Sequence, residues 1–283
     1  MKYYLAHAHF VQDAKLLINY ENKDGFCTFA NGFTLDYKRP MGDKVKKTFQ
    51  FKQFCIKSGE TSMSVGTDGV LLGAWAEIPP HTKSIIDIGT GSGVISLMLA
   101  QRCPNARITG IDINDDAVKT ARENAEKSPF ASNTIYLCAD IRKIAPSMKY
   151  DLIVSNPPFF PKGCLVKGSS RSMARSFETL TPQQLIECAD RIINPNGSLA
   201  VIIPSSIADD FEYWAWEKDF RPTHCTDIVT VHGKKPKRRL MQFVKNYRTI
   251  KKCVDDTLTL QLADGSKTEE YLSLTKDFYI DKT

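Results

Sequence analysis

The strongest chemical signal in the sequence is the run Asn156-Pro157-Pro158-Phe159, which follows the apolar segment 150–155. The two prolines stiffen the backbone and lack N–H donors, while their carbonyl groups remain as acceptors. The Asn156 side chain adds an oxygen acceptor, and the Phe159 ring offers a flat apolar face. Such a loop can hold a planar amine by its N–H groups, aim its lone pair at an electrophile and stack on the attached ring. The alternative interpretation of this run is a turn that ends a strand and has no chemical role.

A glycine-rich loop lies earlier in the chain, in the run SIIDIGTGSG at 84–93. Gly89, Gly91 and Gly93 allow a tight turn and let a ligand approach the backbone closely. Their spacing is GxGxG rather than the GxGxxG of dinucleotide sites, and the carboxylate of Asp87 precedes them. This carboxylate would oppose a pyrophosphate, but it suits a ligand that has an ammonium group and no phosphate. S-adenosylmethionine is such a ligand.

Two more carboxylates follow the next two apolar segments, in the runs GIDI and CAD. Asp112, 21 residues after Gly91, is placed to accept hydrogen bonds from both hydroxyls of a ribose. Asp140 is placed to accept one from the amino group of adenine. Helix capping explains each acid singly. Three acids after three successive strands are instead expected to line one ligand-binding crevice.

Apolar runs and helical patterns alternate through the middle of the chain, which is typical of a parallel sheet covered on both faces. The predicted strands are 84–88, 107–113, 134–139, 150–155 and 198–203, and the predicted helices are 94–102, 115–127 and 182–193. A helix at 206–218 and an antiparallel pair of strands at 227–231 and 240–246 are expected to follow. In the last segment, 258–280, the Asp264-Gly265 turn is expected to join two further short strands or a strand and a helix. The predicted fold is α/β and Rossmann-like, a doubly wound, mostly parallel seven-stranded sheet with an antiparallel edge strand.

Composition and segment lengths restrict the class of protein. The 42% hydrophobic and 25% charged residues are typical of a globular chain and exclude disorder, collagen and a pure coiled coil. No apolar run approaches the roughly 18 residues of a membrane span, and the N-terminus has no uninterrupted apolar stretch, so a cytoplasmic protein is expected. The eight cysteines include no CxxC pair, and we expect no metal site. Residues 1–47 are predicted to form a small strand-rich appendage, and residues 48–283 the main domain.

The positive charge of the chain is unevenly placed. The net charge is only +6, but residues 228–254 contain nine basic side chains and no acidic one. Such a local excess attracts polyanions, including nucleic acids. Most lysine and arginine runs, however, are simply solvated faces.

The runs 87–93 and 156–159 together resemble the class I S-adenosylmethionine-dependent methyltransferases with an NPP[YF] motif. That class includes adenine-N6 and guanine-N2 enzymes acting on nucleic acids and the protein-glutamine N5 enzyme. The run VGTDGVLLGAWA at 65–76, the run 156–160 followed by Met173-Ala174-Arg175, and the ending LSLTKDFY at 272–279 resemble the bacterial tRNA1(Val) (adenine(37)-N6)-methyltransferase family. The resemblance begins near residue 49 and gives no role to residues 1–47.

The resemblance implies S-adenosylmethionine as cofactor and tRNA as substrate, with adenine 37 of tRNA1(Val) as the target. The cofactor-binding residues would be Thr67, Asp68, Asp87, Gly89, Thr90, Gly91, Gly93, Asp112, Ile113, Asp140, Ile141 and Asn156. The target base would be held by Asn156, Pro157, Pro158 and Phe159. The RNA backbone would meet Arg171, Arg175, Lys234, Lys235, Lys237, Arg238 and Arg239.

Other functions compete with this interpretation. An adenine in rRNA or DNA would suit the same loop, and so would the amide of a glutamine in a protein. The glutamine enzymes usually carry a helical N-terminal domain, for which residues 1–47 are too short and too rich in glycine and aromatic residues. A non-catalytic RNA-binding protein is a third alternative, which the intact glycine and NPPF loops disfavour. An NAD dehydrogenase is disfavoured by the GxGxG spacing.

Overall fold

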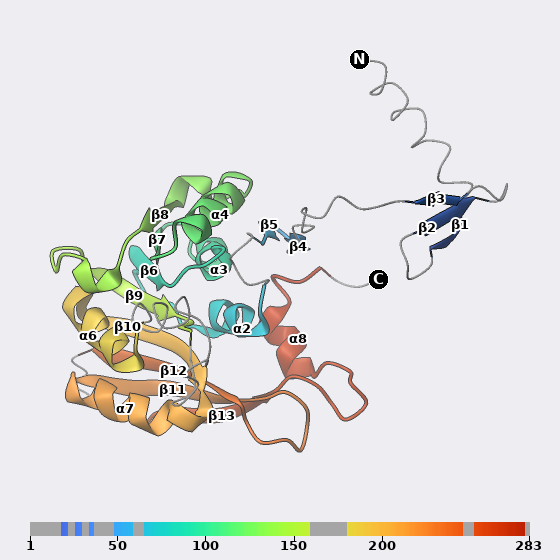
Figure 1. The fold of residues 1–283 in the computed structure, drawn as a ribbon. Coiled ribbons are helices and arrows are strands. Elements are labelled where there is room, and N and C mark those ends of the chain that lie inside the picture. Colours follow the sequence, from blue (N-terminus) through green and yellow to red (C-terminus); the bar gives the residue numbers. More distant parts are fainter. Residues whose placement is uncertain are drawn as a thin grey trace, which may run out of the picture. The chain divides into compact units, whose positions relative to one another are not determined.

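The computed structural model of the chain describes residues 18–21, 26–29, 34–36, 48–58, 65–158, 180–245 and 252–280 (Figure 1). The chain divides into two compact units, Met1–Val45 and Lys46–Thr283. In the smaller unit, β1 (Ile18–Glu21), β2 (Phe26–Phe29) and β3 (Thr34–Asp36) form an antiparallel sheet in the order β1-β2-β3. These strands agree with the strand-rich appendage predicted there.

The larger unit is built on a central sheet whose described strands follow the order β13-β11-β12-β10-β9-β6-β7-β8. The strands are β6 (Ser84–Ile88), β7 (Arg107–Asp112), β8 (Thr134–Cys138), β9 (Tyr150–Ser155), β10 (Ile193–Pro204), β11 (Phe220–Val229), β12 (Arg238–Lys245) and β13 (Val254–Thr259). All of them run in one direction except β12, which is antiparallel to both β10 and β11. The doubly wound, mostly parallel fold is therefore confirmed.

The sheet differs from the predicted one in two details. It has an eighth described strand, β13, and its antiparallel strand β12 lies between β10 and β11 rather than at the edge. The sequence of β13 is VDDTLT, whose exposed acids give little apolar pattern, so the Asp264-Gly265 turn predicted a short strand in this region but not its start at Val254 or its place in the central sheet. The antiparallel pairing of β11 with β12 was predicted from the sequence, but its place in the sheet depends on contacts with the distant β10.

Six described α-helices accompany the sheet, together with three short 3-10 turns. The helices are α2 (Thr67–Trp75), α3 (Val94–Arg102), α4 (Asp115–Glu126), α6 (Pro182–Ile192), α7 (Ala208–Glu217) and α8 (Glu269–Thr275). The 3-10 turns are η2 (Ala131–Asn133), η3 (Ile141–Lys143) and η4 (Ser205–Ile207). Local sequence explains several helix starts. For example, the Thr181 hydroxyl accepts from the Gln184 N–H in a capping box, and Pro182 occupies the first turn of α6.

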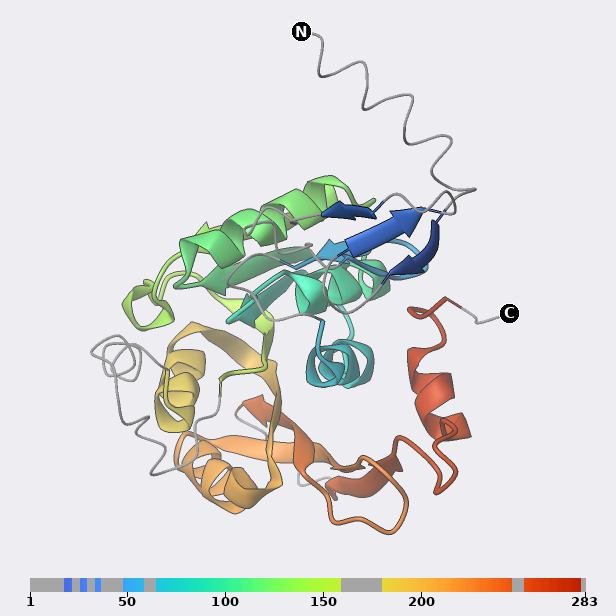
Figure 2. The same ribbon diagram turned by 45° about the vertical axis from the view of Figure 1, so that its right-hand side comes forward.

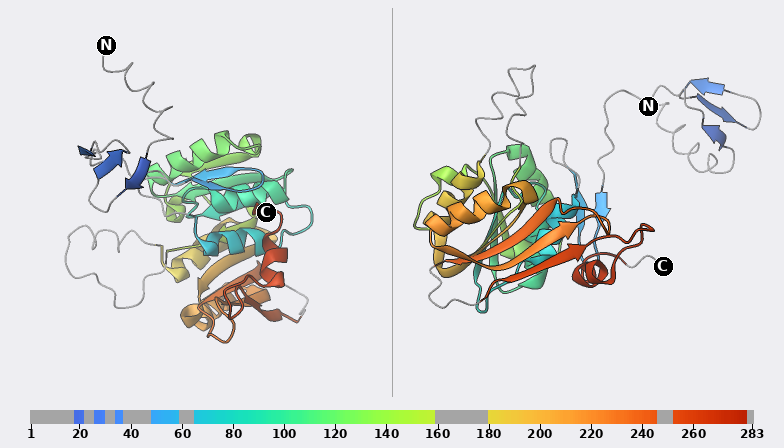
Figure 3. Two further views of the ribbon diagram at one scale, coloured as in Figure 1. Left: turned by 90° about the vertical axis from the view of Figure 1, so that its right-hand side faces the viewer. Right: turned by 90° about the horizontal axis from the view of Figure 1, so that it is seen from below.

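The two faces of the sheet carry separate hydrophobic clusters. Alternating residues of one strand belong to different clusters, as Ile85 and Ile86 of β6 show. Helices α2, α3, α4 and α8 cover the face of Ile85, and α6 and α7 cover the face of Ile86 (Figures 2 and 3). Because both faces are covered, the central parallel strands read as continuous apolar runs.

The hairpin of β4 (Thr48–Gln50) and β5 (Cys55–Lys57) joins the C-terminal segment through aromatic packing. Phe51 is completely buried and stacks on Tyr279 with ring centroids 6.0 Å apart. The Lys52 N–H donates to the carbonyl oxygen of Phe278 at 2.8 Å. Aromatic burial therefore holds the two ends of the larger unit together. Among the described residues, no helix is long and apolar enough to cross a membrane.

The register of the sheet sets where the loops begin. Ile88 at the end of β6 pairs with Ile111 of β7 on one side and with Ser155 of β9 on the other. The residues that follow, Gly89, Asp112 and Asn156, therefore leave the sheet from one row at its carboxyl edge. Ligand sites of open α/β sheets form at this edge.

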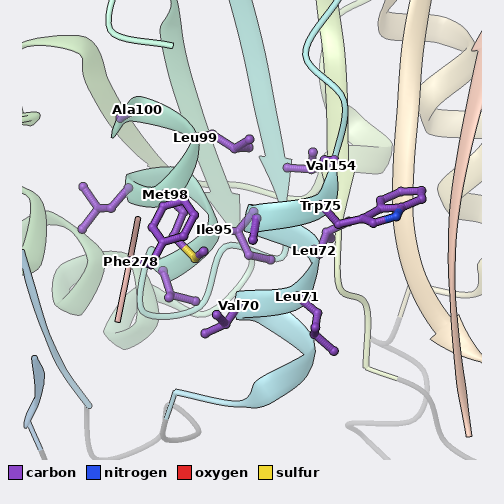
Figure 4. Packing of buried hydrophobic residues seen from close by; sticks show 14 of the residues in the cluster. Val70, Leu71, Leu72, Trp75, Ile95, Met98, Leu99, Ala100, Val154 and Phe278 are labelled. Atoms are coloured by element: carbon purple, nitrogen blue, oxygen red, sulfur yellow. The ribbon is translucent and has the colours of Figure 1, made fainter. Parts of the chain in front are cut away.

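Helix α2 packs against α3 (Figure 4), and Gly69 and Gly73 allow the two helices to approach closely. A Cβ added at Gly69 would lie 3.3 Å from Val94 Cγ1, and one at Gly73 would lie 2.8 Å from Met98 Sδ. The contacts 69–94 and 73–98 advance together, so the two helices run in the same direction. The first turn of α2 therefore lies beside the start of α3, directly after the glycine loop.

Gly73→Ala should destabilise the protein by about 1–3 kcal/mol, because its new methyl group would overlap Met98 within a packed helix interface. Gly69→Ala is the graded control, since the tip of Val94 is 3.3 Å away and needs only a small shift. Denaturant unfolding would measure the free energies of unfolding of both variants. An equal or larger loss for Gly69→Ala would contradict this account of the interface.

Candidate active site

The end of β9 presents the Asn-Pro-Pro run beside the end of β6. The Ser155 hydroxyl donates to the Ile88 carbonyl oxygen at 2.8 Å and joins the two strand ends. Asn156 is half-buried, Pro157 is buried and Pro158 is exposed. The loop therefore begins at a fixed position of the sheet. Phe159, Arg171 and Arg175 lie outside the described residues.

The glycine loop has the backbone shape that its sequence predicts. Gly89, Gly91 and Gly93 have φ values of 77°, 55° and 84°, in the left-handed region that glycine adopts most easily. A Cβ at Gly89 or Gly91 would meet nothing within 4 Å, so the loop keeps one open side. The N–H groups of Gly89 and Thr90 donate to the Ile111 carbonyl oxygen at 2.8 and 3.0 Å, which anchors the loop on β7.

Asp87 lies completely buried beneath this loop. The hydroxyls of Thr90 and Ser96 each donate to its Oδ2 at 2.7 Å. Burial raises the pKa of Asp87 to about 6, and these two hydrogen bonds limit the rise. Its Oδ1 has no hydrogen-bond partner within the described part of the chain. Asp87 therefore shapes the loop and places a buried negative charge behind it at neutral pH.

Asp112 faces the same loop from the end of β7. Its Oδ2 accepts from the Gly91 N–H at 3.0 Å and its Oδ1 accepts from the Asn114 N–H at 2.9 Å. Each oxygen keeps acceptor capacity for a further donor. The next side chain, Ile113, is 52% exposed. A carboxylate with fixed orientation beside an exposed apolar side chain suits a ribose joined to a flat base.

Asp140 begins η3 after β8 and is already engaged by a cation. Arg142 reaches back to both of its oxygens, with Nε to Oδ1 at 2.9 Å and Nη2 to Oδ2 at 2.8 Å. This hydrogen bonding lowers the pKa of Asp140. The adjacent Ile141 is buried. A base amino group would therefore share the carboxylate of Asp140 with Arg142.

The start of α2 contributes Thr67, which is exposed, and Asp68, which is half-buried. Asp68 does not stand alone, because the Nε of Arg238 donates to its Oδ2 at 2.8 Å. Arg238 is the first residue of β12. The structure thus joins two residues that the sequence had assigned to different partners, the cofactor and the RNA.

The basic stretch is divided between opposite edges of the sheet. Lys234, Lys235 and Lys237 are exposed in the connection between β11 and β12, at the carboxyl edge that also carries the glycine loop. Strand β12 then runs the other way for eight residues, about 26 Å. Lys245 therefore lies at the amino edge, where it pairs with Asp190 at 2.7 Å. The stretch is not one continuous basic surface.

Arg239 is held inside the protein. Its Nη1 and Nη2 each lie 2.9 Å from a carboxylate, of Asp227 and Asp255 respectively. Partial burial works to lower the pKa of Arg239, but these two ion pairs outweigh it and raise the pKa. Its charge is balanced locally, so the case for an RNA contact is weaker for Arg239 than for the neighbouring lysines.

Sequence reasoning missed several supporting residues. Ser96 and Arg142 lie near predicted site residues in the chain, and their polar side chains were the only available signal. Asn124 carries no signal at all. It is buried in α4, its Oδ1 accepts from the Lys57 N–H at 3.0 Å, and its Nδ2 donates to the Ser92 carbonyl oxygen at 2.9 Å. Tyr136 packs against Gly93 and Gly110, which is apparent only in three dimensions.

The assembled donors and acceptors fit S-adenosylmethionine. The open side of Gly89 and Gly91 leaves room for the methionine part, and the buried charge of Asp87 favours its ammonium group. Asp112 with Ile113 suits the nucleoside part. Among the described residues, no group of three or more histidine, cysteine or acidic side chains is arranged to hold a metal ion.

Comparisons with known proteins agree with this fit. Residues 63–211 match the family described as Methyltransferase small domain. The fold resembles a crystal structure described as a predicted O-methyltransferase from Agrobacterium tumefaciens, with a TM-score of 0.56, 18% identity, and coverage of 75% of this chain and 96% of that one. The strand order, the loop and the family match define a class I S-adenosylmethionine-dependent methyltransferase.

Two curated relatives narrow the class. Proteins named tRNA1(Val) (adenine(37)-N6)-methyltransferase from Phocaeicola vulgatus and Aeromonas hydrophila are 42% and 36% identical over 232 and 233 residues. Each alignment covers 82% of this chain and 97% of the relative. This chain belongs to the tRNA1(Val) (adenine(37)-N6)-methyltransferase family.

The buried carboxyl of Asp87 should make stability depend on pH. Its pKa is about 6 in the folded protein against 3.8 ordinarily, so the folded state holds a proton that the unfolded state releases between these values. The contribution of Asp87 to stability is complete below pH 3.8 and is lost as pH rises through 6, by roughly 3 kcal/mol over the whole window. Asp87→Asn should therefore gain stability relative to the wild type as pH rises from 4 to 7.5.

Denaturant unfolding of both proteins at several pH values would measure this difference. Taking the difference between the two proteins cancels the contributions of other titrating groups. A difference that stays constant from pH 4 to 7.5 would show that Asp87 does not titrate in this range.

Proposed function

We propose that this chain transfers a methyl group from S-adenosylmethionine to the exocyclic N6 of adenine 37 in tRNA1(Val). The observation that carries the proposal is the row formed by Ile88, Ile111 and Ser155, from which the glycine loop, Asp112 and Asn156 all emerge at one edge. The curated relatives named for this reaction, at about 40% identity, support the choice of RNA and base.

The cofactor side of the crevice would be formed by the loop after β6 and the ends of β7 and β8. Gly89, Thr90, Gly91 and Gly93 line the methionine end, with Asp87 behind them. The remaining cofactor contacts in this proposal are Asp112, Ile113, Asp140 and Ile141, with Thr67, Asp68 and Asn156 at its rim. When bound, S-adenosylmethionine supplies an electrophilic methyl group on a sulfonium centre.

The base would be held by the run Asn156-Pro157-Pro158-Phe159. The adenine amino nitrogen is a weak nucleophile because its lone pair is delocalised into the ring, and orienting it is the main task. The Asn156 side-chain oxygen and the Pro157 carbonyl oxygen accept its two N–H groups, and Phe159 stacks on the ring. As the N–CH3 bond formed and the S–CH3 bond broke, S-adenosylhomocysteine would be the leaving group and positive charge would develop on the nitrogen. The same acceptors would stabilise that charge until the extra proton passed to solvent, so no strong base would be required.

The RNA backbone would lie across the carboxyl edge, where Lys234, Lys235 and Lys237 are exposed at the same edge of the sheet as Asn156. Arg171 and Arg175, after that loop in sequence, and Arg238 complete the proposed contacts, with Arg239 in a lesser role. A tRNA substrate favours a cytoplasmic location. We include in the proposal that residues 48–283 form the methyltransferase domain and residues 1–47 an appendage, which agrees with the compactness of the two units.

Tritiated S-adenosylmethionine with a tRNA1(Val) transcript should yield labelled N6-methyladenosine at position 37 after nucleoside digestion and mapping. Asn156→Ala should lower kcat/KM about 100-fold or more, because a positioned acceptor for the reacting amine is lost. Asn194→Ala is the matched control. It removes an Asn side chain that donates to Asp151 at the opposite edge, and activity should stay near the wild-type value.

DNA, rRNA and protein acceptors in parallel reactions test the competing substrates. Label in one of these acceptors and none in the transcript would refute the tRNA assignment. A protein that binds the cofactor but labels no acceptor would refute the proposed reaction. Equal activities of the Asn156 and Asn194 variants would refute the role given to the NPPF loop.

Replacing Lys234, Lys235 and Lys237 together with alanine should weaken tRNA binding and reduce its salt dependence. Each lost phosphate contact should lower the slope of log Kd against log salt by about 0.7–0.9, so the full change should be about 2–3. The control replaces Lys83, Arg107 and Lys149, three exposed basic residues at the amino ends of β6, β7 and β9. If both triple variants have the same slope, the carboxyl edge is not the RNA-binding edge.

A further inference from the structure

One ion pair connects the proposed RNA-binding edge with the cofactor site. The Arg238 Nε donates to Asp68 Oδ2 at 2.8 Å, although the two residues are 170 positions apart. Arg238 begins β12, next to the exposed lysines of the preceding connection. Asp68 lies in the first turn of α2. The pair therefore spans the two groups of residues that the proposed function assigns to different substrates.

The backbone beside Arg238 is anchored, and its guanidinium has N–H groups that bond no described residue. The backbone at Lys237 is anchored on both sides, by its N–H to the Ile228 carbonyl oxygen at 3.1 Å and by its carbonyl oxygen from the Ser205 N–H at 3.2 Å. The guanidinium carries five N–H groups, of which Asp68 and the Lys237 carbonyl oxygen take two within the described part of the chain. The side chain is 40% exposed. The guanidinium can therefore donate hydrogen bonds to a phosphate while it remains bonded to Asp68.

Asp68 transmits its position to the glycine loop through packing. A Cβ at the next residue, Gly69, would lie 3.3 Å from Val94 Cγ1, and Val94 directly follows Gly93 of the loop. A displacement of the first turn of α2 must therefore displace the start of α3 or open a gap there. Helix α2 thus contacts Arg238 through Asp68 and the start of α3 through Gly69; its packing against α3 is shown in Figure 4.

The first turn of α2 depends on this pair more than the rest of the helix does. The far end is fixed by the Trp75 Nε1 bond to Thr226 Oγ1 at 2.9 Å and by the Arg102 bond to the Gly73 carbonyl oxygen at 2.9 Å. At the near end, the cap residue Gly66 supplies no side-chain hydrogen bond. Among the described residues, the Asp68 carboxylate thus ties that turn to Arg238, a residue of the RNA-binding edge.

We propose that Asp68 and Arg238 couple tRNA binding to cofactor binding, an inference that rests on the proposed function. A phosphate bound by Arg238 orders the guanidinium, which fixes Asp68 and the first turn of α2 against the start of α3. The glycine loop is then held in its cofactor-binding shape. By linkage, RNA tightens cofactor binding, and the cofactor tightens RNA binding by the same factor. Asp68 and Arg238 act here as positioning residues.

The test measures the Kd of S-adenosylhomocysteine by calorimetry with and without a saturating tRNA1(Val) transcript. The readout is the ratio of the two Kd values, which cancels any direct effect of a substitution on cofactor affinity. The wild type should show a ratio of about five or more, the lower part of the usual range of allosteric coupling. Asp68→Asn and Arg238→Gln should each bring the ratio near one, and the double variant should change it no further.

Salt dependence separates the two roles within the pair. Arg238→Gln should lower the salt slope of RNA binding by about 0.7–0.9, because a phosphate contact is lost, whereas Asp68→Asn should leave that slope unchanged. A merely structural pair would not produce this difference. Since a half-exposed pair contributes little to stability, both variants should remain folded, which thermal unfolding checks. Arg221→Gln is the control, because Arg221 pairs with Asp219 near the start of β11, at the opposite edge.

The possible outcomes distinguish the proposed coupling from the proposed methyl transfer on which it rests. A wild-type ratio of one, or single variants that keep the wild-type ratio, would overturn the coupling while methyl transfer to tRNA stands. An equal fall of the ratio in Arg221→Gln would also overturn it, because the effect would then not be specific to this pair. A wild type that neither binds nor methylates the transcript would overturn the proposed function and the inference together.

Discussion

The carboxylate of Asp87 lies inside the larger unit, bound by the hydroxyls of Thr90 and Ser96 and exposed to no solvent. Burying a charge is costly, and here hydrogen bonds from the loop and helix that it shapes offset only part of that cost, so the pKa of Asp87 stays raised. The left-handed glycines bend the chain around this group, and the loop is anchored on β7 by the Ile111 carbonyl oxygen. A strand end, a loop and a helix start are thereby fixed to one another around a single side chain.

A mostly parallel sheet places the carboxyl ends of its strands at one edge. Among the described strands, the antiparallel β12 brings further residues to that edge. Because β12 runs against its neighbours, the connection that precedes it returns to the carboxyl edge. The exposed lysines of that connection therefore share an edge with the glycine loop and Asn156. The same reversal carries Lys245 to the opposite edge, where Asp190 balances its charge. Sheet direction, rather than the number of basic residues, determines which charges can serve the site.

Periodicity and loop motifs predicted the central part of the fold, because buried parallel strands and amphipathic helices leave strong local patterns. β6 and β9 have the bounds expected from their apolar runs. The Asp264-Gly265 turn predicted a short strand before it, but the acids of β13 hide its start at Val254 and its place in the central sheet, and the place of β12 depends on a distant partner. The motif residues lie together at one edge, while their roles stay predictions. Asn124 and the Asp68–Arg238 pair were invisible in the sequence, since they depend on residues more than 60 positions apart.

The outer strand β13 also affects how molecules of this protein meet one another. If the sheet ended at β11, the unpaired backbone N–H and C=O groups of that strand could pair with an extended segment of another chain. Such pairing leads to strand addition and aggregation. β13 occupies this position and carries the neighbouring exposed side chains of Asp255 and Asp256. Asp255 pairs with Arg239, and Asp256 Oδ2 lies 3.2 Å from His224 Nε2, so a second copy that approached edge to edge would have to desolvate these paired groups. The VDDTLT segment thus disfavours edge-to-edge association at this side of the sheet.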